Sequence, residues 1–153
     1  MTNDLELSML YDSYISERAK VVFTWSLSIV DCYAISSAFL SLVQDESVVE
    51  LVRLTDSGRW SERVQLKDAY GVHVIDTEAP TGDMVLVHES SGSACYWDED
   101  ERFVAVVGDE AFLRLVRPYP DEIERDYYIQ MMSDAGVNAV AELGRFFDRV
   151  KAS

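Results

Sequence analysis

Histidine and cysteine, the side chains that most often bind metals or act as nucleophiles with a base, are few and widely spaced. His73 and His88 are the only histidines, and Cys32 and Cys95 are the only cysteines. No His-x-x-x-His or Cys-x-x-Cys spacing occurs, although zinc sites commonly draw their ligands from such spacings. A site built from His73, His88 and Cys95 would lack this support, so we expect no metal and no cofactor.

Patterns typical of catalysis are equally sparse. The chain has no Gly-x-Ser-x-Gly elbow and no glycine-rich phosphate loop, and its seven glycines stand apart. A Ser–His–Asp arrangement needs only one histidine, so a small enzyme using His73 or His88 stays open as an alternative. Carboxylates are abundant, but in an acidic chain their number alone does not indicate acid–base catalysis. The sequence therefore favours a binding protein over an enzyme.

The charge is strongly negative and unevenly distributed. The net charge is −15, from 28 acidic and 13 basic residues. Between Asp76 and Glu110, ten acidic residues are offset by one basic residue, Arg102. Such an excess repels phosphate backbones and anionic membrane surfaces, and it attracts basic surfaces. We therefore expect a basic protein partner, whose association slows as salt rises, and no direct contact with nucleic acid or membrane.

The densest acidic run lies next to two aromatic residues, between two segments that read as strands. It has two interpretations: a solvated hairpin tip that keeps a sheet edge soluble, or an acidic lobe that docks on a basic partner. A calcium loop is not indicated, because no Asp-x-Asp-x-Asp-Gly pattern is present. On the docking interpretation, the predicted partner-binding residues are Tyr96, Trp97, Asp98, Glu99, Asp100, Glu101, Glu89 and Asp83.

Residue periodicity predicts the elements that would position these side chains. Apolar spacing predicts helices over about 4–20, 31–44, 110–117, 121–131 and 138–150, with Asp31, Asp109 and Asn138 as N-caps. Branched, aromatic or alternating runs predict strands at 21–25, 48–54, 60–66, 72–75, 84–88, 94–97 and 103–107. The turn residues Thr55–Gly58 predict a hairpin between the second and third of these strands.

The order of these elements indicates the fold class. Strands in a run, with helices gathered at the N- and C-terminal ends, predict an α+β fold with a mainly antiparallel sheet of about six strands. A length of 153 residues fits a single domain spanning 1–153. Residues 21–43 are apolar, but Asp31 in their middle would cost about 3 kcal/mol in a membrane. A buried strand followed by a buried helix explains this stretch better.

A short stretch near the end of the strand region resembles a known family. There a strand leads to Gly108-Asp109 and then to the helical run Glu110-Ala111-Phe112-Leu113-Arg114-Leu115. This stretch, in a compact acidic α+β protein, is similar to members of the SUKH immunity superfamily. Those are cytoplasmic antidotes to secreted polymorphic bacterial toxins. The resemblance implies a cytoplasmic inhibitor that masks the active site of a toxin, many of which are nucleases with basic clefts.

Two other binding functions fit the same small acidic chain. One is a secretion chaperone or adaptor, a class of proteins that is usually dimeric. The other is an inhibitor that mimics nucleic acid through its acidic surface. Both would bind a protein, and neither would catalyse a reaction.

Overall fold

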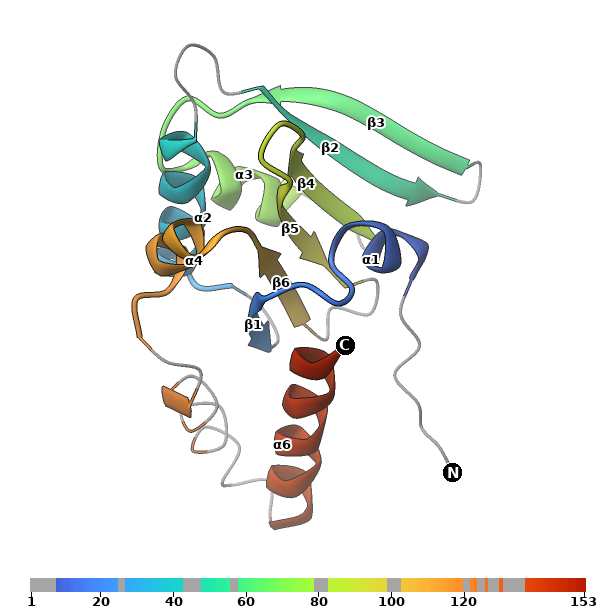
Figure 1. The fold of residues 1–153 in the computed structure, drawn as a ribbon, viewed down its shortest axis with the longest axis vertical. Helices are drawn as coiled ribbons and strands as arrows, with labels where there is room; N and C mark the ends of the chain where they lie inside the picture. Colours follow the sequence, from blue (N-terminus) through green and yellow to red (C-terminus); the bar gives the residue numbers. More distant parts are fainter. Residues whose placement is uncertain are drawn as a thin grey trace.

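In the computed structural model, a six-stranded antiparallel sheet carries helices on both faces (Figure 1). The structure describes residues 8–24, 27–42, 48–55, 58–78, 83–98, 103–119, 122–123, 126, 130 and 137–153. The strands are β1 (Lys20–Thr24), β2 (Val48–Thr55), β3 (Gly58–Gln65), β4 (Met84–His88), β5 (Ser93–Trp97) and β6 (Phe103–Val107). The helices are α1 (Met9–Tyr14), α2 (Ile29–Ser41), α3 (Gly71–Glu78), α4 (Glu110–Val116) and α6 (Val137–Ala152). The predicted α+β class is thereby confirmed.

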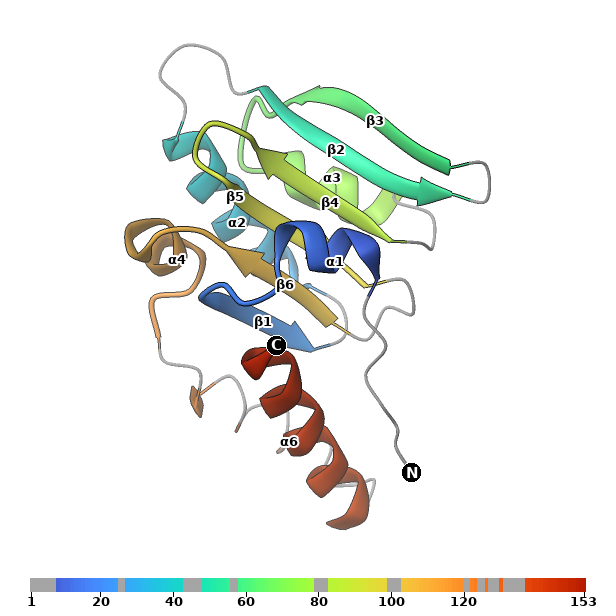
Figure 2. The ribbon, with the colours of Figure 1, turned by 45° about the vertical axis from the view of Figure 1, so that its right-hand side comes forward.

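The sheet is a central meander extended on both sides. Its strand order is β1-β6-β5-β4-β2-β3, and every neighbouring pair is antiparallel. The β2–β3 hairpin pairs Thr55 with Gly58, as the turn residues predicted. The φ of Gly58 is 119°, a backbone conformation that residues with a side chain rarely adopt. The meander β4-β5-β6 occupies the centre, so β1 and β3 form the two edges (Figure 2).

Apolar side chains are buried on both faces of the central strands, which gives two separate cores. All five residues of β5 and all five of β6 are buried. On one face they pack with residues of α2, α3 and α4, including Phe39 and Phe112, whose rings meet edge to face at 5.2 Å. On the other face they pack with α1 and α6, through Tyr11, Phe147 and Val150.

Side chains cap the starts of three helices, and at α1 the Ser8 hydroxyl accepts a hydrogen bond from the Tyr11 backbone N–H. Asp109 caps α4 as predicted, because its carboxylate accepts a hydrogen bond from the Phe112 backbone N–H at 2.8 Å. The cap of α2 is Ser28, where Asp31 was expected. Asp31 is the third helical residue, and its carboxylate accepts a hydrogen bond from the Ser28 backbone N–H, which completes a capping box. The sequence signal for a helix start was right, but it was placed three residues late.

The prediction of a strand at 72–75 was wrong, since these residues lie in α3. Val72 is fully buried, and its backbone N–H donates to the Ser36 hydroxyl on α2 at 2.9 Å. A neighbouring helix therefore caps the start of α3, which no local sequence pattern could reveal. Strand propensity in branched residues is weak and depends on context, so this contact outweighs it.

Other boundaries also differ from expectation. The helix predicted over 4–20 is present as α1 from Met9, and the chain reaches β1 at Lys20 through Glu17, whose φ is 64°. The last helix begins at Val137, so Asn138 lies inside it. The helix predicted over 121–131 falls largely outside the described residues. Within the described ranges, none of the helices has the length and apolarity needed to cross a membrane.

Substitution of Phe147 tests the core between the sheet and α6. Phe147 is 3% exposed, so Phe147→Ala should lower the free energy of unfolding by about 3–5 kcal/mol. Phe146→Ala is the matched control and should cost less, because Phe146 is only half-buried. Urea unfolding of both variants measures the difference. A cost below about 1 kcal/mol for Phe147→Ala would contradict its burial in the core.

Candidate partner-binding surface

The described residues of the predicted acidic site do not form one exposed face. Asp83 is 6% exposed and Asp98 4%, because they flank the central strands β4 and β5. Asp83 accepts a hydrogen bond from the Tyr96 hydroxyl at 2.6 Å. The Ser8 hydroxyl lies 3.1 Å from the same Tyr96 oxygen. Burial, and then the bond to Asp83, raises the pKa of Tyr96, so its proton stays in place near neutral pH. Asp83 and Tyr96 thus stabilise the fold from within.

Trp97 and Glu89, two further residues of the predicted site, lie apart from each other. Trp97 is 8% exposed, and its indole N–H donates to Asp76 at 2.9 Å. Glu89 is exposed in the turn after β4, at the opposite end of that strand from Asp83, and a hydrogen bond with Glu50 raises its pKa. Glu99, Asp100 and Glu101 lie outside the described residues. Their contact with a partner, and that of Glu89, stays a prediction.

An aromatic groove lies beside β3, at the far edge of the sheet. Its volume is about 490 Å³, and β2, β3, α3 and the turn before α3 line it. Trp60, Tyr70 and Val74 line the groove and are 42%, 57% and 44% exposed. The Arg53 guanidinium lies 5.7 Å from the centre of the Trp60 ring. We refer to this hollow as the β3 groove.

Alternation along β3 and contacts with two helices position the groove residues. Trp60 and Val64 stand opposite Arg53 and Val49 of β2, on the face that α2 and α3 cover. Tyr70 is held in the turn before α3, where its backbone N–H donates to Asp68 at 2.9 Å. The alternation of Trp60 and Val64 was visible in the sequence. Tyr70 was missed, since it joins them only because residues 71–78 form a helix.

A second hollow, of about 770 Å³, runs along the edge strand β1 and has a basic lining. The basic residues of its lining are Arg18, Lys20, Arg114, Arg117 and Lys151. Arg117 donates to the Val22 carbonyl at 3.1 Å, and the Lys151 ammonium donates to the Lys20 carbonyl. Burial lowers the pKa of both Lys20 and Lys151. The cationic groups of Arg117 and Lys151 therefore bind backbone carbonyls along the edge of β1, which is a structural role.

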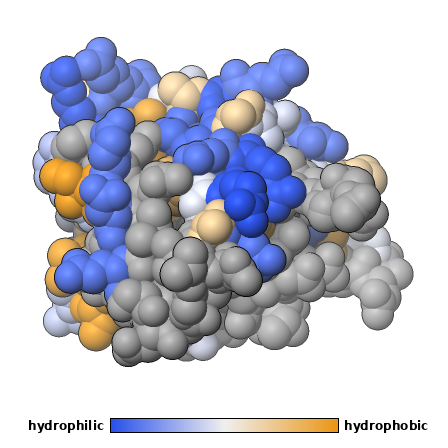
Figure 3. Space-filling model, turned by 90° about the horizontal axis from the view of Figure 1, so that it is seen from below, coloured by the Kyte–Doolittle hydropathy of each residue, from blue (hydrophilic) through white to orange (hydrophobic). Residues whose placement is uncertain are grey.

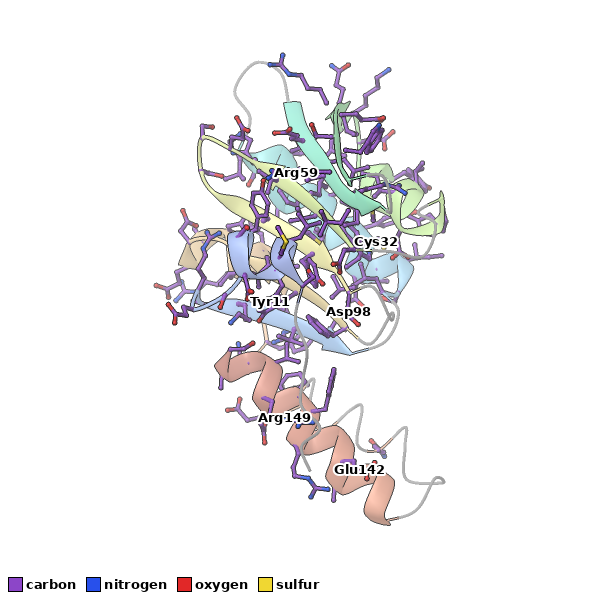
Figure 4. The ribbon with its side chains drawn as sticks, turned by 90° about the vertical axis from the view of Figure 1, so that its right-hand side faces the viewer. Tyr11, Cys32, Arg59, Asp98, Glu142 and Arg149 are labelled. Carbon is purple, nitrogen blue, oxygen red and sulfur yellow. The ribbon has the colours of Figure 1, made fainter. Side chains whose placement is uncertain are left out.

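Hydrophilic residues dominate the described part of the face seen from below, and hydrophobic ones gather mainly along one side (Figure 3). Glu142 and Arg149 both lie on α6, which is drawn below the sheet in Figure 4. Both side chains are exposed. This helix therefore buries one face against the sheet and leaves charged residues at the surface.

The two cysteines lie near each other in one core, whereas the two histidines lie on different elements. Cys32 and Cys95 are buried free thiols, and burial raises the pKa of both. His73 lies on α3, whereas His88 ends β4 and contacts the Ser91 hydroxyl at 2.7 Å in an exposed turn. Across the described residues, no three histidine, cysteine or acidic side chains are placed to share a metal ion.

Comparison with protein-family models, curated proteins and solved structures found no match to this chain. The function is therefore argued from the geometry of its surfaces.

Tyr96→Phe tests the structural role of Asp83. The substitution leaves a buried carboxylate without the tyrosine donor, so the free energy of unfolding should fall by about 1–3 kcal/mol. Tyr14→Phe is the control, because the Tyr14 hydroxyl bonds to Arg59 at the surface, and its cost should stay within about 0.5 kcal/mol. Equal costs in denaturant unfolding would refute this role.

Cys32→Ala gives a pH-dependent prediction. Burial raises the pKa of the Cys32 thiol from 9.0 to about 12. Above pH 9 the unfolded thiol ionises while the folded one keeps its proton, so this residue's contribution to stability declines as pH rises toward 12. The stability difference between wild type and Cys32→Ala should be constant below pH 8 and shrink above pH 9. Unfolding curves at several pH values would show a constant difference if the thiol were accessible.

Proposed function

We propose that the chain is a cytoplasmic immunity protein that binds a basic toxin domain and masks its active site. The exposed aromatic β3 groove carries this proposal. Trp, Tyr and Arg are the residues most enriched at the energetic centres of protein interfaces, and Trp60, Tyr70 and Arg53 supply all three in one hollow. The proposal places the apolar anchor at the exposed Trp60, because Trp97, one of the predicted partner-binding residues, is buried.

Arg53 adds a reason for the groove to take a partner. Its Nε is buried and has no hydrogen-bond partner, while its guanidinium rests on the Trp60 ring. A buried donor without an acceptor costs about 1–3 kcal/mol. The Nε atom is enclosed in the free protein, so a partner carbonyl or carboxylate in the groove would satisfy it once the guanidinium turned toward the partner. Binding that includes this turn would remove an unfavourable feature of the free protein as well as bury aromatic surface.

The net charge supports the choice of a basic partner. At −15, the chain creates a negative field that accelerates encounter with a positively charged protein. Such steering acts on the association rate and weakens as salt screens the charges. The groove would then set the dissociation rate, because apolar anchors act mainly on the lifetime of a complex. Charge and groove thus have separate roles in one binding reaction.

The test is capture from the native host followed by a neutralisation assay. The wild-type chain should retain a basic protein that Trp60→Ala and Tyr70→Ala lose, since each removes an anchor. Tyr119→Ala is the matched control, because Tyr119 is an exposed aromatic residue outside the groove. Inducible expression of the captured protein should arrest growth. Co-expression of wild type or Tyr119→Ala should restore growth, whereas co-expression of the groove variants should not.

Two results would contradict the proposal. Growth that is unaffected by the captured protein would exclude a toxin. A captured protein that stays fully active in the complex would instead indicate a chaperone or adaptor, which binds its client without blocking it. Thermal melts of every variant exclude loss of folding as the cause.

A further inference from the structure

The two edges of the sheet are treated differently. Along β1, cationic side chains of Arg117 and Lys151 occupy the outward carbonyls of Val22 and Lys20. Along β3, no described strand pairs with the outer side, and every described side chain except that of Val64 is exposed. Exposed strand edges invite pairing with another chain, and proteins usually block them. The chain thus blocks the β1 edge and leaves the outer side of β3 without a partner strand among the described residues.

The open backbone groups of β3 can be assigned from its pairing with β2. The Leu54 N–H points toward β4, since it donates to the Asp83 carbonyl at 3.3 Å. Leu54 and its partner Arg59 therefore form a pair without mutual hydrogen bonds. Hydrogen-bonded and non-hydrogen-bonded pairs alternate along the strand, so the backbone N–H and C=O groups of Arg59, Ser61 and Arg63 point outward. Those of Trp60 and Glu62 form hydrogen bonds with β2.

A second copy of this chain is a poor occupant of the open edge. When two β3 strands pair antiparallel and each face of the sheet continues across the pair, every residue must stand opposite a residue that lies on the same face in the other copy. The two registers with the greatest overlap place Arg59 opposite Arg63, or Glu62 opposite its own copy. Like charges directly opposite each other destabilise a strand pair. The edge therefore disfavours self-association and suits a different chain.

We propose that the partner docks by adding an antiparallel strand to β3. To complement the charges of β3, that strand would carry acidic residues opposite Arg59 and Arg63 and a basic residue opposite Glu62. It would carry apolar residues opposite Trp60 and Val64. Arg59 suits an acidic neighbour, because within the chain its guanidinium donates a hydrogen bond to the neutral hydroxyl of Tyr14, the last residue of α1. Arg63 has Glu89 in its surroundings, so Arg59 carries more of this preference.

The β3 groove continues this docking mode. Strand addition gains affinity from main-chain bonds and specificity from hollows that take alternate side chains. The apolar residues of the added strand would stand on the same face as Trp60 and Val64, where the groove opens between β3 and α3. The inference rests on the proposed function only for the partner's identity. A basic toxin would present one such alternating segment.

A synthetic peptide tests the docking mode without the natural partner. The sequence TVEKTVE, run antiparallel to residues 59–65, places glutamate opposite Arg59 and Arg63 and lysine opposite Glu62. Amide chemical shifts should change along β3 and in the groove at millimolar peptide. Binding should weaken by about tenfold in Ser61→Pro, which loses an outward N–H without losing a bond to β2. Ser61→Ala keeps that N–H and should bind like wild type.

Charge reversal provides the second arm. The peptide TVKETVK should bind wild type weakly, and it should bind the triple variant Arg59→Glu, Glu62→Lys, Arg63→Glu at least as well as TVEKTVE binds wild type. No shift changes on β3 with millimolar TVEKTVE, or equal binding to Ser61→Pro and Ser61→Ala, would overturn strand addition. Because neither arm measures neutralisation, these results separate a wrong docking mode from a wrong function.

Discussion

Burial of the central strands on both faces is the constraint on which the rest of the structure depends. The residues of β5 and β6 are apolar or small on both sides of the sheet and are shielded from water throughout. Burial of apolar surface is the main favourable contribution to folding, so both faces must be covered. Helices α2, α3 and α4 cover one face, and α1 and α6 cover the other. Both faces of the central strands are therefore covered, and the edges and ends of the sheet are the parts that another molecule could contact.

The same constraint explains the placement of the acidic residues. Residues that flank buried strands must either reach water or find donors within the protein, because an unpaired buried charge is costly. Asp83 and Asp76 find donors in the aromatic residues Tyr96 and Trp97. Asp109 instead caps a helix. Part of a dense acidic stretch in the sequence therefore becomes a set of separate structural contacts, whereas Glu89 and Glu110 of the same stretch are exposed.

The two edges of the sheet differ in whether side chains of the same chain occupy their backbone groups. Arg117 is stacked near Phe23 and bonded to Val22, so it holds β1 closed and links that edge to α4. The β3 edge keeps its backbone groups and its aromatic neighbours Trp60 and Tyr70 accessible. An open edge next to an aromatic hollow combines main-chain pairing with side-chain anchoring. That combination supports the proposal that the chain binds another protein.

Local sequence signals determined much of the fold. Strands 84–88 and 103–107, the hairpin around Gly58 and the Asp109 cap follow from branched residues, turn residues and a capping side chain that act over a few positions. Only the tertiary structure decided the helical state of residues 71–78, because Ser36 caps that helix from 36 residues away. Burial of Asp83 was likewise decided by strand order, which brings the Tyr96 hydroxyl to its carboxylate. Exposure and pairing of this kind depend on neighbours distant in sequence, so charge counts along the chain could not show which acidic residues are exposed.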